Sequence, residues 1–326
     1  MHKVYDLWPE IAQKNYEKDF DEIDFGDISH IVFAGMGGSG ALGDIFSSIL
    51  SKTDIHVDVV KGYLLPKTVN SETVVVATSV SGNTEETLNV LSSAVKLDSK
   101  VIAFSDNGKM REFCRKKNVE HRKIPIMHSP RASFPAFLFS MLKVLEPFLP
   151  IEKKDIINSI TTLKKQKEVI GSQCLSEKNP SFSIAKWISD IPLIYYPWGL
   201  QAAAIRFKNS LQENAKMHVI TEDIIEASHN GIVAWNHPSK IKPILIQGDD
   251  DYIKTKERWD IIKEFFQEKN IDYLEINSVK GDILSKLINL IYLVDYATIY
   301  RAIMSEIDPT PVEAIDFIKK KLNDET

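Results

Sequence analysis

The chain has 326 residues, of which 44% are hydrophobic, and its 40 basic and 45 acidic residues give a formal net charge of -5. That length and apolar content suffice for a large core divided over two domains, at about 100–200 residues per domain. The slight acidic excess argues against nucleic acid or a membrane surface as the main partner, because both usually require clustered lysine and arginine. Any positively charged site must therefore be local.

The N-terminus and the two cysteines indicate the compartment. The start, MHKVYDLWPEIAQKNYEKDF, is too acidic and too poor in continuous apolar residues for a signal or transit peptide. We expect no apolar run near the roughly 20 residues that a membrane-spanning helix needs. Cys114 and Cys174 show no CxxC or Cys/His spacing, so we expect reduced thiols. Together these features predict a cytosolic protein.

The first half of the chain alternates short apolar runs with helical patterns. The central runs are nearly continuous, which is typical of parallel strands covered on both faces. We therefore predict a doubly wound α/β domain. Two prolines and a charge cluster in Glu146–Asp155 mark its end, giving domains 1–150 and 151–326. The predicted strands are Ile31–Ala34, Ile55–Val60, Thr73–Thr78, Lys100–Ser105 and Val119–Ile124.

The second half shows a similar alternation and predicts another α/β layer domain. It begins with a long helix, Lys154–Ile170, and contains no second copy of the glycine-rich or serine-rich loops of the first half. The predicted strands are Ile191–Tyr196, Lys216–Ile220, Lys242–Gln247 and Ile271–Ile276. The predicted helices are Gly199–Asn214, Lys256–Glu268 and Ile283–Met304.

A glycine-rich loop follows the first predicted strand, in the sequence IVFAGMGGSGALG. Gly35, Gly37 and Gly40 satisfy the GxGxxG fingerprint of dinucleotide-binding folds. That fingerprint also requires an acid at the end of the next strand, about 20 residues on, to hold the ribose. Here the next strand ends in a lysine and a glycine, and its only acid, Asp58, lies within it. The loop alone is therefore weak evidence for a dinucleotide.

A serine-rich loop follows the third predicted strand, in the sequence TVVVATSVSGNTEET. The spacing of Ser79, Ser81 and Thr84 lets three hydroxyls converge where a helix begins. Hydroxyls, free backbone amides and the positive end of a helix together suit a monophosphate. The alternative is that these residues only cap the helix that starts near Thr84. A Walker A phosphate loop is excluded, because GxxxxGK[ST] is missing.

GMGGSG followed by SVSGNTEET resembles the sugar isomerase (SIS) domain, in which the serine-rich loop binds the phosphate of a sugar phosphate. SIS modules occur in enzymes and in regulators. The resemblance therefore implies the class of ligand rather than an activity.

Interconversion of an aldose and a ketose phosphate needs a base that moves a proton between C2 and C1 through an enediolate. It also needs an acid/base for ring opening and a positive charge near the developing oxyanion. No metal is chemically necessary. Glu213, at the end of a predicted helix, and His229, in a short polar stretch, are candidates. Taken alone, each residue fits a surface role better, Glu213 as a solvated helix-end carboxylate and His229 as a surface or capping histidine.

Four separated motifs make the resemblance more specific. They are PRA in the first half, ENAK at Glu213–Lys216, HN at His229 and Asn230, and DPTP near the C-terminus. With them the whole chain resembles the bifunctional phosphoglucose/phosphomannose isomerases, which have two SIS domains. The resemblance implies a homodimer without a cofactor, acting on glucose 6-phosphate and mannose 6-phosphate with fructose 6-phosphate as the common product. That reaction belongs to glycolysis and gluconeogenesis.

The resemblance also implies roles for individual residues. Glu213 matches the proton-transferring glutamate, and Arg131 matches the arginine near the enediolate. His229 matches the ring-opening histidine, which in the family comes from the neighbouring subunit. Thr310 matches the threonine associated with accepting both C2 epimers. Lys319 matches an active-site lysine, with Lys320 and Lys321 as alternatives, and the phosphate loops fall on Gly37, Gly38, Ser39, Ser79, Ser81 and Thr84.

Two alternatives stay open from the sequence. A non-catalytic SIS sensor could bind a sugar phosphate and regulate a partner, although it would need neither the glutamate nor the histidine and arginine. Another isomerase could act on an amino-sugar, pentulose or heptose phosphate. Eight histidines could include metal ligands, but without HExxH or a Cys/His cluster we interpret them as scattered surface residues and predict no metal site.

Overall fold

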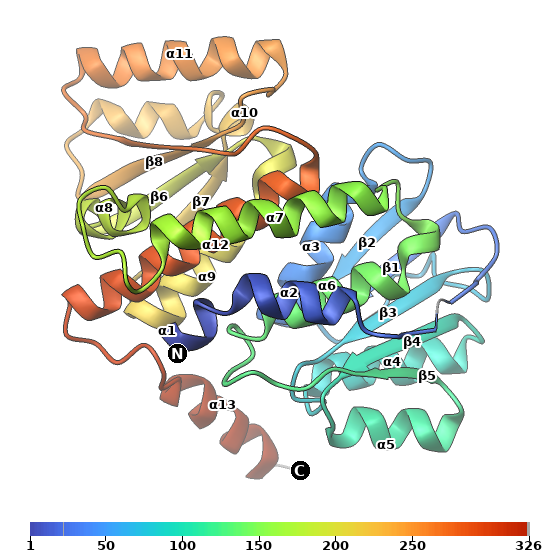
Figure 1. Cartoon of the computed structure of the whole chain (residues 1–326). Helices are drawn as coiled ribbons and strands as arrows, with labels where there is room; N and C mark the ends of the chain where they lie inside the picture. The colour runs from blue at the N-terminus through green and yellow to red at the C-terminus, as the bar shows by residue number, and fades with distance from the viewer. Residues whose placement is uncertain (22, 325–326) are drawn as a thin grey trace.

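The computed structural model describes residues 1–21 and 23–324 and contains two parallel β-sheets, one in each half of the chain (Figure 1). The first is five-stranded, in the order β2-β1-β3-β4-β5. This confirms the predicted parallel α/β fold of the first half. Its strands are β1 (His30–Ala34), β2 (His56–Val60), β3 (Val74–Thr78), β4 (Lys100–Ser105) and β5 (Glu120–Lys123).

Helices cover both faces of this sheet. Side chains alternate along a strand, so Ile31 and Phe33 enter the large core with α3 and α6, whereas Val32 and Ala34 pack with α4. Both faces are apolar for this reason, which explains the nearly continuous apolar runs. The helices are α3 (Gly38–Leu50), α4 (Glu85–Lys96), α5 (Gly108–Lys117) and α6 (Phe134–Val144).

The second sheet is four-stranded, in the order β7-β6-β8-β9. In Figure 1, α10 and α11 lie above it, and α9 and α12 lie below it. This half is therefore a second parallel-sheet α/β unit, as predicted. The strands are β6 (Ile191–Tyr196), β7 (Ile220–Asp223), β8 (Ile241–Gln247) and β9 (Leu274–Asn277), and the helices are α8 (Pro180–Trp187), α9 (Gln201–Ala215), α10 (Ile224–Ala227), α11 (Ile253–Glu268) and α12 (Ile283–Met304).

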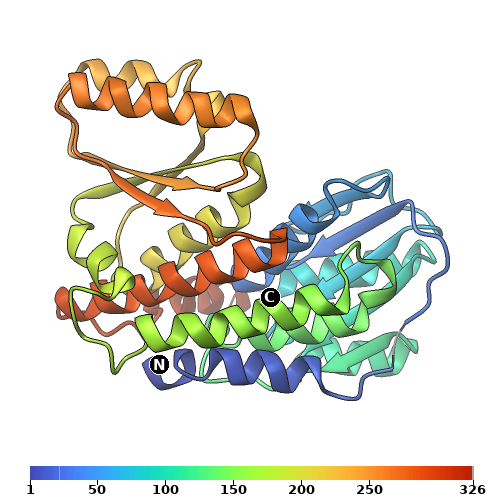
Figure 2. The same cartoon turned by 45° about the horizontal axis from the view of Figure 1, so that its top comes forward.

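Long helices join the two halves around one continuous core. Figure 2 shows α7 (Lys153–Ile170) beside α12, with the N-terminal helices α1 (His2–Tyr5) and α2 (Trp8–Tyr16) next to α7. The rings of Trp8 and Tyr292 stack there with centroids 5.3 Å apart. The N-terminus is thus part of the core of both halves.

Helix α12 corrects the expectation that no apolar run is long enough to span a bilayer. Among the described residues it is the one helix that meets the length and composition of a membrane span. However, 78% of its apolar window is buried inside the protein. It packs against α7, α8 and α9, which accounts for its apolar composition as that of a core helix.

One predicted strand was wrong and some elements were missed. The strand expected at Lys216–Ile220 begins only at Ile220, because α9 continues to Ala215 and Lys216 ends it in a left-handed conformation (φ 56°, ψ 34°). The other predicted strands each overlap an observed one. Helices α8, α10 and α13 (Glu313–Asp324) were not predicted, and α13 projects from the body of the molecule in Figure 1. Cys114 and Cys174 are free thiols.

Candidate active site

The glycine-rich and serine-rich loops meet at the carboxyl ends of two adjacent strands. The chain leaves β1 toward β2 on one side of it and later enters β3 on the other side. Such a reversal of strand order is where open α/β sheets bind their ligands. The backbone N–H of Val80 donates to the hydroxyl of Ser39 at 3.4 Å, so the loops touch. One small ligand can therefore contact both.

The serine-rich loop forms a set of connected hydroxyls. Ser79 Oγ lies 2.9 Å from Thr84 Oγ1 and accepts a hydrogen bond from Gly82 N at 3.0 Å. Gly82 has a φ of 72°, and a Cβ there would lie 1.7 Å from the carbonyl oxygen of Asn107, so only glycine fits. Thr84 is the N-cap residue of α4, yet its side chain makes no capping hydrogen bond. Helix capping alone therefore does not explain its hydroxyl.

Two helices begin at these loops. Helix α3 starts at Gly38, directly after Gly37, and α4 starts at Glu85. The first amides of a helix have no partner within the helix, and they carry its partial positive charge. Hydroxyls and two helix N-termini together form an anion site of the kind that suits a phosphate group. All six residues predicted for phosphate binding lie on these loops or in the first turn of α3: Gly37, Gly38, Ser39, Ser79, Ser81 and Thr84.

Arg131 lies at the centre of a second polar cluster, which joins three distant parts of the chain. Its Nη1 is 3.1 Å from Glu213 Oε2, and its Nε donates to Asn214 Oδ1 at 2.7 Å. Its Nη2 donates to the carbonyl oxygens of Pro309 and Thr310. The Arg131 side chain is 5% exposed and that of Glu213 is 27% exposed. The structure thus brings Arg131, Glu213 and the backbone of Thr310 together.

A buried ion pair, Arg206–Asp295, contacts the backbone of this cluster. Arg206 Nη2 lies 2.6 Å from Asp295 Oδ2, with the two side chains only 2% and 0% exposed. Burial disfavours the charged guanidinium, but the Asp295 carboxylate outweighs this and holds the pKa of Arg206 above its ordinary value. Arg206 Nη2 also donates to the carbonyl oxygen of Arg131 at 2.8 Å. The pair therefore fixes the backbone that carries Arg131.

Arg206 also connects the two polar clusters. Its Nη1 lies 3.4 Å from where a Cβ on Gly38 would be. Arg206 therefore lies between the start of α3 and the backbone of Arg131, and the two clusters are neighbours. Arg206 and Asp295 were not among the predicted site residues. The signal that could have found them is a charged residue inside an apolar run, AAAIRF in α9 and LIYLVDYATIY in α12, since buried charges are almost always paired.

Lys216 is a further residue that sequence reasoning did not assign. Its Nζ donates to the carbonyl oxygens of Glu213 and Pro311, the latter at 2.7 Å. Burial and the nearby Arg131 guanidinium lower the pKa of Lys216 below its ordinary value, against the opposing effect of Glu213. Lys216 ties the end of α9 to the segment before α13. Lys216 is the last residue of the ENAK motif, which names the position but not these contacts.

The described chain does not bring His229 or Lys319 to this cluster. His229 is exposed at the end of α10, where its backbone N–H donates to Glu226 O at 2.9 Å. In Figure 1, α10 lies above the second sheet, on the opposite side of the molecule from α13. Lys319 is exposed on α13, as are Lys320 and Lys321. Within the described residues, no hydrogen bond or ion pair joins His229 or Lys319 to Arg131 or Glu213.

Two parallel α/β units with a phosphate-type loop at the carboxyl edge of the first sheet define a two-domain SIS protein. Residues 25–142 match the model of the SIS domain, and residues 177–322 match that of the bacterial phospho-glucose isomerase C-terminal SIS domain. The chain is 32% identical to a bifunctional phosphoglucose/phosphomannose isomerase of Caldicellulosiruptor bescii, over 98% of this chain and 97% of the relative. The chain therefore belongs to the bifunctional phosphoglucose/phosphomannose isomerase family.

Further relatives agree with this assignment. A protein of the same description from Aquifex aeolicus is 29% identical over 90% of both chains. The crystal structure of a glucosamine-6-phosphate deaminase from Thermotoga maritima superimposes with a TM-score of 0.70, covering 94% of this chain and 95% of that one at 13% identity. At such low identity the structural likeness establishes the fold only.

Proposed function

We propose that this protein interconverts glucose 6-phosphate and mannose 6-phosphate with fructose 6-phosphate, by metal-free proton transfer through an enediolate. The observation that carries the proposal is the Arg131–Glu213 pair at 3.1 Å, which neighbours the glycine-rich loop because Arg206 lies next to both Gly38 and the Arg131 backbone. A base, a cation and an anion site close to one another are what an aldose–ketose isomerase needs. The family membership supports the same choice of substrates.

In this mechanism the 1–150 domain holds the phosphate and the 151–326 domain supplies the base. Glu213 takes the proton from C2 and returns it to C1, while the hydroxyl proton of O2 passes to O1, so that the C1 aldehyde becomes an alcohol and C2 becomes the ketone. The Arg131 guanidinium offsets the negative charge of the enediolate. Arg131 is also held by Asn214, Pro309 and Thr310, so it can keep its position when Glu213 turns toward the sugar. Thr310, next to this cation, is proposed to help accept both C2 epimers.

Ring opening is assigned to His229 of a second subunit. Within one chain His229 is exposed two residues after α10, and Figure 1 places α10 on the opposite side of the molecule from α13, so the proposed role requires a homodimer. Helix α13 offers a further contact surface, because Ile315, Phe317 and Ile318 are all exposed on it. Lys319 on the same helix is proposed to approach the site in the dimer. The reaction places the protein in cytoplasmic glycolysis or gluconeogenesis, without a nucleic-acid or membrane partner.

A coupled assay tests the proposed function. Glucose 6-phosphate and mannose 6-phosphate are offered separately in the presence of EDTA, and fructose 6-phosphate is measured. Turnover of both is expected, because proton transfer by Glu213 needs no metal. Turnover of neither would contradict the proposal, and turnover of only one would restrict it to a single epimer.

Mixed dimers test the shared site. Glu213→Gln and His229→Ala homodimers are each expected to be inactive. When the two inactive chains are co-assembled, about half of the dimers pair one of each, and such a dimer keeps one site with both wild-type residues. Partial recovery of activity is therefore expected on mixing after dissociation. No recovery, with mixed dimers demonstrated by mass spectrometry of differently tagged chains, would place both residues in the same subunit's site.

A further inference from the structure

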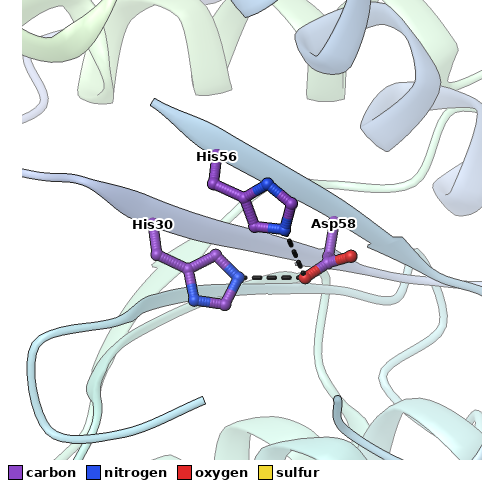
Figure 3. A group of neighbouring side chains, drawn as sticks. All are labelled: His30, His56 and Asp58. Carbon is purple, nitrogen blue, oxygen red and sulfur yellow. Dashed lines mark hydrogen bonds and ion pairs between the residues drawn. The ribbon is translucent and has the colours of Figure 1, made fainter. Parts of the chain in front are cut away.

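His30, His56 and Asp58 form a cluster outside the site described above (Figure 3). His30 Nε2 lies 2.9 Å from Asp58 Oδ2, and His56 Nε2 lies 3.4 Å from the same oxygen. The ring centroids of the two histidines are 5.0 Å apart. Figure 3 shows both imidazole rings with a nitrogen directed at this one carboxylate oxygen.

The register of two parallel strands creates the cluster. His30 opens β1 and His56 opens β2, and the two residues pair in the sheet. Asp58 is two residues further along β2, so its side chain leaves the same face of the sheet as that of His56. The cluster lies at the amino ends of these strands, whereas the phosphate-type loops follow carboxyl ends. The cluster and the phosphate-type loops therefore lie at opposite ends of the strands.

We propose that this cluster binds one divalent transition-metal ion, with Zn²⁺ as the best match, through His30 Nε2, His56 Nε2 and the Asp58 carboxylate. Two imidazoles and a carboxylate are a donor set that such ions prefer, and water completes the tetrahedron. Ligand atoms bound to zinc at about 2.0–2.1 Å stand roughly 3.3 Å apart. The three donor atoms already lie within 4.8 Å of one another.

The surroundings of His30 suit a metal ligand. Its other ring nitrogen, Nδ1, lies 3.2 Å from the hydroxyl of buried Thr73, and that hydroxyl accepts from Asn70 N at 3.1 Å. A partner on the second nitrogen fixes ring orientation and tautomer, as is usual for histidines that bind metals. A simple His30–Asp58 hydrogen bond would satisfy both groups. It leaves unexplained why a second imidazole approaches the same oxygen.

The position of the cluster indicates a structural role for the ion. The His56 side chain is 66% exposed, which gives an ion a path from solvent. Strand β2 is an outermost strand of the first sheet, so the ion would link this outermost strand to β1. A ligand that binds only the folded state stabilises it. The ion is therefore structural, and the chemistry at Glu213 does not depend on it.

Calorimetric titration of the chelator-treated full chain with Zn²⁺ tests the proposal, with Co²⁺ as a spectroscopic probe. Wild type is expected to bind one ion per chain, to show the intense visible bands of tetrahedral Co²⁺, and to unfold at a higher temperature with Zn²⁺. Asp58→Asn and His56→Ala should each weaken binding by at least about tenfold. His237→Ala, which removes an exposed histidine outside the cluster, should bind like wild type.

Two results would overturn the proposal. One is the lack of saturable binding by the wild-type chain, a measurement that does not depend on any variant folding. The other is a variant of Asp58 or His56 that binds Zn²⁺ as tightly as wild type does. Isomerase activity that each variant retains in the EDTA assay shows that the variant is folded. Because this assay does not involve the metal, the metal-site proposal can fail while the proposed function holds, and the reverse.

Discussion

Glu213→Gln is expected to lower kcat for both hexose phosphates by about 10²–10⁴-fold or more, which is the usual contribution of a general base. The amide that replaces the carboxylate cannot accept the proton from C2. Its size is the same, and its oxygen can still accept the hydrogen bond from Arg131 that Glu213 accepts at 3.1 Å. Binding of glucose 6-phosphate should therefore change little, because the proposed phosphate site lies on the loops at Ser39 and Ser79.

Three measurements check this expectation: kcat in the coupled assay, the affinity for glucose 6-phosphate by calorimetry, and deuterium incorporation from D₂O at C1 and C2. The variant should bind sugar phosphate, turn over negligibly and incorporate no deuterium. Glu264→Gln, at an exposed position on α11, is the matched control and should behave like wild type. Retained turnover in Glu213→Gln would remove Glu213 from the mechanism, and loss of binding would make it a positioning residue.

The sheets were predictable because their signals are local. Strands β1, β3 and β4 are covered on both faces, so they appear in the sequence as short continuous apolar runs. The phosphate-type loops were predictable for a related reason. Parallel strands put their carboxyl ends at one edge, so two loops that follow neighbouring strands must come together there.

Contacts between segments that are far apart in the sequence could not be predicted from local patterns. The run after Asn214 has the alternation of a strand, but a left-handed Lys216 delays β7 to Ile220. Neither its spacing nor its charge indicates that Lys216 reaches back to the carbonyl of Glu213. Likewise the register that pairs His30 with His56 is a property of the folded sheet. The prediction of scattered histidines failed to anticipate this cluster for that reason.

Arg206→Met is expected to destabilise the protein by about 3–5 kcal/mol, the usual cost of removing one partner from a buried ion pair. Asp295 would be left as a buried carboxylate whose remaining partners include Ser210, which donates to it at 2.6 Å. Methionine retains much of the volume, so a cavity contributes little. Urea unfolding measures the change. Lys254→Met, which breaks an exposed pair with Glu257, is the control and should cost less than about 1 kcal/mol.

The double variant Arg206→Met/Asp295→Leu separates the ion pair's two effects. Replacing a whole buried pair with apolar side chains is often neutral or stabilising, so most of the lost stability should return. Activity should not return, because the carbonyl of Arg131 no longer receives its hydrogen bond at 2.8 Å and the guanidinium beside Glu213 is less well positioned. A double variant as unstable as Arg206→Met would show that the unpaired carboxylate is not the cause. One that recovers full kcat/KM would show that Arg206 has no part in positioning Arg131.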